Sequence, residues 1–194
     1  MLRHIRPAVM MVVLMTLLTG LAYPLALTGL AQVLFPDQAN GSLVIEGGRV
    51  IGSRLIGQGF TAPGYFHGRP SATEPAYNAD NSGGSNLGPT SKALVARVTA
   101  DIARLRAENP DSVRAGLPIP ADLVTASASG LDPDISPAAA LFQVARVAKA
   151  RRLSDAAVQA LVQGQIRQPL FGLYGEPRVN VLALNLALDK LAGG

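Results

Sequence analysis

A long uncharged stretch near the N-terminus constrains most strongly how this chain can fold. From Pro7 to Pro36, 30 consecutive residues carry no charge: "PAVMMVVLMTLLTGLAYPLALTGLAQVLFP". An α-helix rises about 1.5 Å per residue, so roughly 20 residues cross a hydrocarbon core of about 30 Å. A signal peptide has a shorter apolar region of about 7–15 residues before a small-residue cleavage site. The sequence therefore predicts a retained transmembrane helix over residues 7–34, with a signal peptide as the alternative.

The charges on either side of this stretch predict its orientation. Arg3, His4 and Arg6 precede it, and Asp37 is the first charged residue after it. Basic residues are enriched on the cytoplasmic side of membrane helices. We therefore expect residues 1–6 in the cytoplasm and residues 35–194 outside it. In a bacterium with two membranes, this is a single-pass inner-membrane protein with a periplasmic domain.

Small residues recur within the predicted helix. Thr16 and Gly20 are four positions apart, and so are Ala22 and Ala26. This spacing lets another helix approach closely. Pro24 is expected to loosen the backbone one turn after Gly20, which membrane helices tolerate when neighbours pack around them. The pattern favours a helix–helix contact, although Gly and Pro are also common in membrane helices without such a role.

The composition excludes several classes of function. The net charge is +4, but without Arg3 and Arg6 the chain has 15 basic and 13 acidic residues. No basic block is interleaved with aromatic residues, so nucleic acid is not expected as a partner. The chain has no cysteine, which excludes disulfides and thiolate chemistry.

The rest of the chain predicts an extracytoplasmic α/β or α+β domain. Two β-branched runs around Gly47-Gly48 indicate a hairpin. Helix caps and apolar periodicity predict helices over about 91–108, 136–152, 154–167 and 180–191. A long loop, residues 58–90, separates the hairpin from the first of these helices. Loops of this length are functional or disordered, and four aromatic residues argue against disorder here: Phe60, Tyr65, Phe66 and Tyr77.

The end of this loop, "SGGSNLGPTSK", resembles a phosphate-binding turn only superficially. It opens into a helix, but neither G-x-x-x-x-G-K-[ST] nor G-x-G-x-x-G is present. The two histidines, His4 and His67, lie on opposite sides of the membrane, and no G-x-S-x-G elbow supports a catalytic triad. Asp132 and Asp134 suit the approach to a helix N-terminus better than an acid–base pair. We therefore expect no catalytic and no metal-binding residues, with a membrane-tethered periplasmic hydrolase as the alternative.

Five segments, in order behind one membrane helix, carry a resemblance to a known family. They are "GSRLIGQGF", "YFHGRPSA", "SGGSNLGPTS", "DLVTASASGLDPDISPAAALFQVARVAKAR" and "GEPRVNVLALNLALD". Together they resemble the KdpC subunit family of the bacterial Kdp potassium-transporting ATPases. The resemblance implies a non-catalytic subunit of a high-affinity potassium pump. Its implied partners are a potassium-conducting subunit, a P-type ATPase subunit and a small membrane subunit.

The resemblance also implies a role in assembly and as a catalytic chaperone that raises the ATP affinity of the ATPase subunit. No cofactor is expected to bind tightly to this chain, and any association with ATP is expected only within the complex. A periplasmic domain cannot easily touch ATP in the cytoplasm, so the effect is either long-range coupling or weak direct binding. For direct binding, the resemblance points to Ser127, Ser129 and Gln143. Ala128 and Asp134 replace a glycine and a histidine of the family pattern, which puts any imidazole role at 134 in doubt.

The Asn/Gly/Ser loop is predicted to be a docking surface for the extracellular face of the potassium-conducting subunit. The residues expected to form it are Asn78, Gly83, Gly84, Ser85, Asn86 and Gly88. Their polar groups can bond to the local backbone or to a partner. Bulky substitutions at Gly83, Gly84 or Gly88 are expected to disrupt the complex without unfolding the domain.

Overall fold

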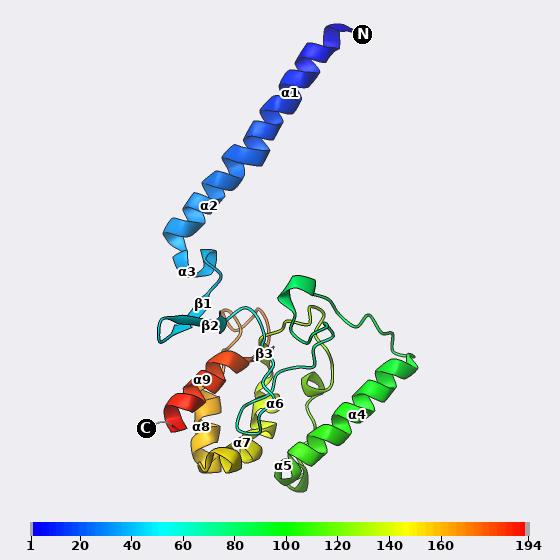
Figure 1. Cartoon of the computed structure of the whole chain (residues 1–194), viewed down its shortest axis with the longest axis vertical. Helices are drawn as coiled ribbons and strands as arrows, with labels where there is room; N and C mark the ends of the chain where they lie inside the picture. The colour runs from blue at the N-terminus through cyan, green and yellow to red at the C-terminus, as the bar shows by residue number, and fades with distance from the viewer. Residues whose placement is uncertain (1, 193–194) are drawn as a thin grey trace. The chain divides into compact units, whose positions relative to one another are not determined.

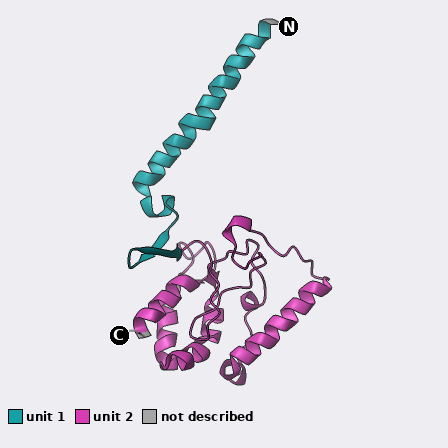
Figure 2. Cartoon of the chain, in the orientation of Figure 1, with its two compact units in different colours: residues 1–53 teal, residues 54–194 magenta. Residues whose placement is uncertain are grey.

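The computed structural model describes residues 2–192 of the chain. They divide into two compact units, residues 1–53 and residues 54–194 (Figure 2). The first unit contains the uncharged stretch and the hairpin, and the second contains the remaining helices and the long loops (Figure 1). The predicted domain boundary after residue 34 therefore precedes the hairpin, whereas the second compact unit begins after it.

The first unit begins with an apolar helix that runs without interruption from Ile5 to Leu34, after a short 3₁₀ turn at Leu2–His4. Its parts are α1 (Ile5–Leu17), a π-helical turn (Leu18–Ala22) and α2 (Tyr23–Leu34). The π-helical turn ends two residues before Pro24, whose missing N–H removes one bond of the helical ladder. The Thr19 hydroxyl donates to the Met15 carbonyl at 2.6 Å. The helix spans 30 residues, and its most apolar 18-residue window has a mean hydropathy of 2.0, which confirms one N-terminal helix long and apolar enough to cross a membrane.

The predicted hairpin follows this helix. After a short turn of helix, α3 (Pro36–Ala39), strand β1 (Leu43–Glu46) pairs antiparallel with β2 (Arg49–Ser53). Gly47 and Gly48 have φ of +57° and +78°. Tight two-residue hairpin turns need this left-handed backbone, which glycine adopts without a Cβ penalty.

The second unit is an α+β domain of short helices and one small sheet. Its helices are α4 (Lys92–Glu108), α5 (Pro110–Arg114), α6 (Pro137–Phe142), α7 (Val144–Arg151), α8 (Asp155–Gln165) and α9 (Val181–Ala192), with 3₁₀ turns at Ala79–Asn81 and Ala121–Leu123. Strands β3 (Asp134–Ile135) and β4 (Val179–Asn180) pair antiparallel. Ser91, Ser136 and Ser154 cap α4, α6 and α8, each accepting a hydrogen bond from a backbone N–H of the first turn.

The single helix predicted over 136–152 is wrong, because the chain breaks at Gln143 into α6 and α7. The Gln143 N–H donates to the Ala140 carbonyl at 3.1 Å, three residues back, instead of continuing the α-helical ladder. The Gln143 side chain is 1% exposed and bonds to groups outside the helix. The buried amide at the break is therefore satisfied by hydrogen bonds to His67 and Ala139.

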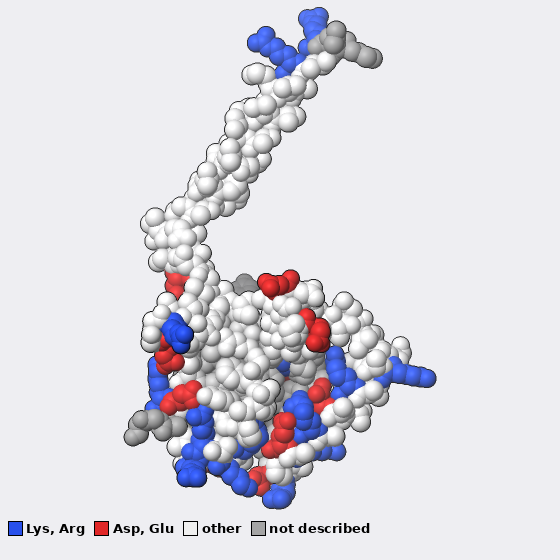
Figure 3. All heavy atoms as spheres, in the orientation of Figure 1, with Lys and Arg blue, Asp and Glu red and all other residues white. Residues whose placement is uncertain are grey.

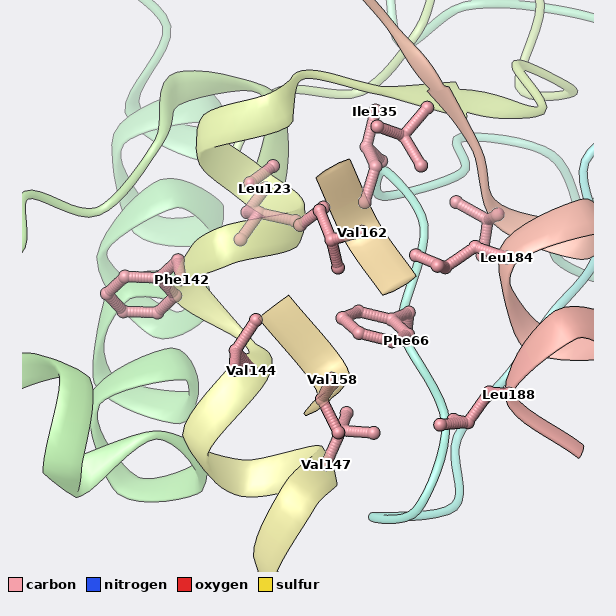
Figure 4. Close-up of a cluster of buried hydrophobic side chains, with 14 of the residues drawn as sticks. Phe66, Leu123, Ile135, Phe142, Val144, Val147, Val158, Val162, Leu184 and Leu188 are labelled. Atoms are coloured by element: carbon pink, nitrogen blue, oxygen red, sulfur yellow. The ribbon is translucent and has the colours of Figure 1, made fainter. Parts of the chain in front are cut away.

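The core lies between α6, α7, α8 and α9 (Figure 4). Its largest fully buried apolar side chains are Phe66, Leu123, Phe142, Val147, Val158, Val162, Val179, Leu184 and Leu188. Phe66 comes from the long loop, so the loop contributes to the core. Phe60 and Tyr65 also pack together, with ring centroids 5.5 Å apart. The prediction that the loop is ordered by its aromatic residues is confirmed.

Candidate functional site

Two loops of the second unit, residues 57–86 and residues 125–134, bond to each other along their length, and we call them the interlocked loops. The backbone N–H of Gly57 donates to the Leu131 carbonyl at 2.8 Å, and that of Gly83 donates to the Ser129 carbonyl at 2.9 Å. The Ser71 hydroxyl donates to the Gly130 carbonyl at 2.8 Å. The loops therefore form one ordered surface although they lie far apart in the sequence.

Glycine is required where the two loops approach most closely. Gly130 has a φ of +69°, and a Cβ there would lie 2.5 Å from Thr73 Cγ2 and 2.9 Å from the Gly83 carbonyl oxygen. A Cβ at Gly57 would lie 2.5 Å from the Asp132 carbonyl oxygen. These contacts leave no room for a side chain, so the backbones themselves pack together.

A charged and aromatic group links the first loop to Asp132. The Arg69 guanidinium forms an ion pair with Asp132 at 2.8 Å and donates to the Thr125 carbonyl at 3.4 Å. The Tyr77 hydroxyl donates to the Arg69 carbonyl at 2.6 Å. Burial, together with the Asp132 carboxylate, raises the pKa of Tyr77 above 10.0, so the phenol keeps the proton that it donates.

Two buried amide side chains hold the extended segment at Phe66 and His67, and we call them the amide clamp. Asn185 accepts from the Phe66 N–H at 2.8 Å and donates to the Phe66 carbonyl at 3.0 Å. Gln143 does the same for the next residue, accepting from the His67 N–H at 2.8 Å and donating to its carbonyl at 3.1 Å. Both amides are 1% exposed. They take the place of neighbouring strands, because they satisfy backbone groups that have no sheet partner.

Two arginines extend this support along the same segment. Arg146 donates to the Tyr65 carbonyl at 3.0 Å and to Gln143 Oε1 at 2.6 Å. Arg151 donates to the Gly64 carbonyl at 2.8 Å, pairs with Asp189 at 2.6 Å and stacks over the Tyr65 ring. The start of the first loop is thus fixed to α7 and α9.

His67 lies beside the amide clamp with its side chain 15% exposed. Its Nδ1 is 3.6 Å from the Glu108 carboxylate, and its Nε2 is 3.1 Å from the Ala62 carbonyl oxygen. Burial, followed by the nearby Arg146 charge, lowers the pKa of His67 below 6.5, and Glu108 offsets this only in part. Both ring nitrogens face groups of the fold, which gives no support to a hydrolytic role for this histidine.

The lowered pKa of His67 predicts that the second unit loses stability in mild acid. Below about pH 6.5 the unfolded chain binds a proton at this histidine that the folded chain resists. Stability is therefore fully present above about pH 6.5 and falls until the pH passes the folded pKa. Denaturant unfolding of the full chain between about pH 7.5 and pH 5 should show this loss. The loss should shrink in His67→Gln and persist in His4→Gln, and equal pH dependence in both variants would contradict the assignment.

The three predicted nucleotide-binding residues all take part in the fold. Ser127 is buried and accepts from the Gly130 N–H at 2.8 Å. Ser129 is exposed and accepts from the Leu131 N–H at 3.1 Å. Both serines belong to the interlocked loops, whereas Gln143 belongs to the amide clamp. Direct nucleotide binding by these residues stays a prediction.

The predicted docking residues divide into internal and accessible positions. Asn78 supports its own loop, accepting from the Asp80 N–H at 3.0 Å and donating to the Glu74 carbonyl at 3.2 Å. Gly83 and Gly88 face open space, since a Cβ at either would meet nothing within 4 Å. Ser85 is half-buried, and Asn86 is exposed with a φ of +51°.

Gly84 differs from the other two loop glycines. A Cβ there would lie 2.9 Å from the Ala128 carbonyl oxygen, a backbone atom of the other interlocked loop. A bulky substitution at Gly84 would therefore push the two loops apart. At Gly84 we therefore expect a bulky substitution to disturb the interlocked loops as well as the complex.

The acidic residues near the start of α6 have structural partners. Asp122, which no sequence motif indicated, accepts from the Ser136 N–H at 2.7 Å and from its hydroxyl at 3.1 Å. Asp134 instead pairs with Arg178 at 3.1 Å and accepts from Asn180 at 3.1 Å. The carboxylate at position 134 thus joins β3 to β4. Within residues 2–192, no three His, Cys, Asp or Glu side chains group as a metal site.

A hollow opens on the surface of the interlocked loops, with a volume of about 550 Å³. Its walls are mostly apolar, formed by Leu55, Ile56, Leu131 and Pro133. Arg69, Ser127 and Ser129 supply polar groups at the same place. The hollow can bind an apolar group that has a polar edge. Its lining does not provide a set of side chains that could react with such a group.

These features define a protein with one N-terminal helix long and apolar enough to cross a membrane and an α+β unit whose surface is built from mutually bonded loops. Comparison with known proteins identifies the family. The model of the family described as "KdpC: K+-transporting ATPase, c chain" matches residues 5–190. Relatives named potassium-transporting ATPase KdpC subunit are 63% identical in Methylobacterium nodulans, covering all of both chains, and 61% identical in Rhodopseudomonas palustris strain TIE-1, covering 99% of each. The chain belongs to the KdpC family of potassium-transporting ATPase subunits.

Proposed function

We propose that this chain is the accessory subunit of a high-affinity, ATP-driven potassium uptake pump. Its family membership supports this role, as does a single apolar helix joined to a unit whose described residues hold no grouped set of reacting side chains. Figure 3 shows that the helix carries no charged side chain along its length and has basic side chains at its N-terminal end. Arg3 and Arg6 therefore favour a cytoplasmic N-terminus, with the second unit in the periplasm and the helix in the inner membrane.

The interlocked loops, together with the adjoining residues 87 and 88, are the proposed docking surface for the potassium-conducting subunit. The proposal rests on one observation. The two loops are held in shape by bonds to each other, yet among the described residues they position no set of reacting groups. Backbone hydrogen bonds, close glycine contacts and the Arg69–Asp132 ion pair fix their shape before any partner arrives. A pre-formed surface loses little conformational entropy on binding. The hollow of about 550 Å³ gives a partner side chain a place to enter.

The membrane helix is proposed to pack against the other membrane subunits, including the small one. Within this chain its residues are 0% buried over the most apolar window, so every face is available for contact. Thr16, Gly20, Ala22 and Ala26 are the positions at which another helix can come closest. The π-helical turn at Leu18–Ala22 lies among them.

The proposed chaperone effect on ATP affinity is best explained as coupling across the complex. Gln143, the central residue of the direct-binding hypothesis, is 1% exposed, and its amide bonds to His67, Ala139 and Arg146. A nucleotide could reach it only by displacing the amide clamp. Docking that favours one state of the pump raises the ATP affinity of another subunit without contact, as a coupling free energy between sites.

Gly88→Leu tests docking without disturbing the fold. A Cβ at this position meets nothing within 4 Å and requires no left-handed backbone, so the domain stays folded while the surface gains bulk. We expect at least a tenfold loss of partner subunits co-purifying with the tagged full chain, equivalent to about 1.4 kcal/mol of binding free energy. The ATP affinity of the ATPase activity in the same preparation should fall with it.

Gly164→Leu serves as the control for Gly88→Leu, since Gly164 also faces open space without a left-handed backbone but lies on α8, outside the interlocked loops. It should co-purify partners at the wild-type yield. Ser129→Ala separates the two routes to ATP affinity. Normal co-purification with normal ATP affinity supports coupling, whereas normal co-purification with reduced ATP affinity supports direct contact. Wild-type yield from Gly88→Leu would contradict docking at this part of the loop.

A further inference from the structure

The turn between α8 and β4 exposes four large apolar side chains, and we call residues 170–174 the apolar turn. Leu170 is 63% exposed, Phe171 85%, Leu173 79% and Tyr174 69%. Single exposed apolar residues are ordinary, but a contiguous group of them marks a contact with a partner or a membrane. Neither the family membership nor the docking proposal gives this turn a role.

The apolar turn bonds four of its five backbone N–H groups internally or to the adjoining Pro169. Leu170 and Tyr174 exchange hydrogen bonds at 3.0 and 3.1 Å, the Gly172 N–H donates to the Pro169 carbonyl at 3.0 Å, and the Leu173 N–H donates to the Leu170 carbonyl at 3.1 Å. At its base, Arg167 and Arg178 exchange backbone bonds at 2.8 and 3.0 Å. Four N–H groups of the turn therefore need no water, which lowers the cost of moving it into an apolar medium.

Two features of Phe171 do not stabilise the fold. Its φ is +55°, a left-handed conformation that is unfavourable for a bulky residue, and its ring is 85% exposed. Glycine or asparagine would occupy this backbone with less strain. A contact outside the chain explains why an aromatic side chain stands at the tip.

The charge pattern around the turn matches a membrane interface. Residues 168–175, "QPLFGLYG", carry no charge. Arg167 precedes them, and Glu176 and Arg178 follow, with the Arg178 guanidinium paired to Asp134. Aromatic residues concentrate at the boundary between headgroups and acyl chains, and arginines such as Arg167 favour the anionic headgroup level. Charged residues are thus confined to the base of the turn, and the tip is apolar.

The membrane anchor keeps the second unit close to a bilayer surface. Gly41 lies seven positions after Leu34, a length that spans at most about 25 Å. The hairpin adds little length, because the Ser53 hydroxyl bonds back to the Gly41 carbonyl at 2.7 Å, and Arg54 follows directly. Such a short connection gives the second unit a high effective concentration of lipid, so weak insertion becomes significant.

We propose that the apolar turn inserts into the lipid interface on the side of the membrane that holds the second unit. Phe171 and Leu173 enter the boundary between headgroups and acyl chains, and Tyr174 lies at headgroup level. A lipid surface fits a convex tip with internally bonded backbone, whereas a protein partner would need a matching apolar cavity. This contact goes beyond the docking role, since it fixes the second unit against the bilayer and not against a subunit.

Tryptophan fluorescence tests this proposal cleanly, because the chain contains no tryptophan. Phe171→Trp places a single tryptophan at the tip. The substitution exchanges one aromatic side chain for another and leaves the backbone of the turn unchanged. Val95→Trp is the matched control, since Val95 is 58% exposed on α4. The full chain is reconstituted in vesicles of phosphatidylethanolamine and phosphatidylglycerol, with and without lipids brominated on their acyl chains. Circular dichroism checks that both variants are folded.

We expect the indole of Phe171→Trp to emit at shorter wavelength than that of the control and to be quenched by the brominated lipids. The control should emit as a water-exposed indole and be quenched by iodide in the aqueous phase. Emission of the Phe171→Trp probe like that of the control would overturn the proposal. So would a blue shift that appears only when partner subunits are added and that brominated lipids do not quench, because the turn would then bind a protein.

Discussion

Gln143→Leu is expected to destabilise the second unit by about 3 kcal/mol, although it replaces a polar residue in the interior by an apolar one. The substitution removes both hydrogen bonds to the His67 backbone and one to Arg146. Each buried polar group left without a partner costs about 1–3 kcal/mol. The backbone at His67 has no sheet neighbour to replace the amide, so it loses these bonds, whereas Arg146 and Arg151 of α7 still hold Tyr65 and Gly64.

Urea unfolding of the full chain, followed by circular dichroism, measures this change, and hydrogen exchange at the His67 amide reports it locally. Gln163→Leu is the matched control, because Gln163 is exposed on α8. Its effect should stay within about 0.5 kcal/mol. Equal midpoints for the two variants, or an unchanged exchange rate at His67, would show that the amide clamp does not hold the loop.

Gly130→Ala is expected to cost about 3 kcal/mol as well, for a different reason. The added Cβ combines left-handed strain with overlap of the Thr73 methyl group and the Gly83 carbonyl oxygen. Strain at such a backbone costs about 1–3 kcal/mol, and overpacking a tight contact costs a similar amount. The interlocked loops must separate to make room.

Gly116→Ala isolates the two contributions. Gly116 has a φ of +75°, but a Cβ there would meet nothing within 4 Å, so alanine at this position meets strain without overlap. Its cost should be about 1 kcal/mol. Unfolding free energies of the two variants, measured side by side, should therefore differ by about 2 kcal/mol, the share due to overlap. Similar values would mean that the loops do not pack as closely as the distances indicate.

Local patterns predicted the parts of this fold that depend on local physics. The membrane helix follows from an uncharged stretch, the hairpin from Gly47-Gly48, and the helix starts near residues 91, 136 and 154 from capping residues and apolar periodicity. Each of these signals concerns residues within a few positions of one another. The same reasoning predicted that the loop aromatics would pack, and Phe66 is 0% exposed.

The features that local patterns missed depend on contacts between distant residues. Asn185 bonds to Phe66 across 119 positions, and Gln143 to His67 across 76. A lone asparagine within the apolar pattern of α9 was the available signal for the first. The break at Gln143 had no local signal, because alanines and valines on both sides favour one continuous helix. The apolar turn was missed because "PLFGLYG" is too short to distinguish an exposed turn from a buried strand.

The resemblance identified the family, but the structure changes how the proposed site residues are viewed. The family pattern pointed to Ser127, Ser129 and Gln143 for nucleotide binding, and all three hold loops or segments of the fold. The fold depends to the same degree on Arg69, Asp122 and Asn185, yet no sequence motif indicated these residues. A family pattern preserves residues that shape a surface as well as residues that touch a ligand.

A subunit of a potassium-pumping ATPase should leave the membrane together with its partners. We would purify the tagged full chain from gently solubilised membranes of potassium-starved cells and assay ATPase activity in the eluate. We expect partner subunits to elute with the chain and potassium to stimulate the activity. Elution of the chain alone, without potassium-stimulated ATPase activity, would contradict its role as a subunit.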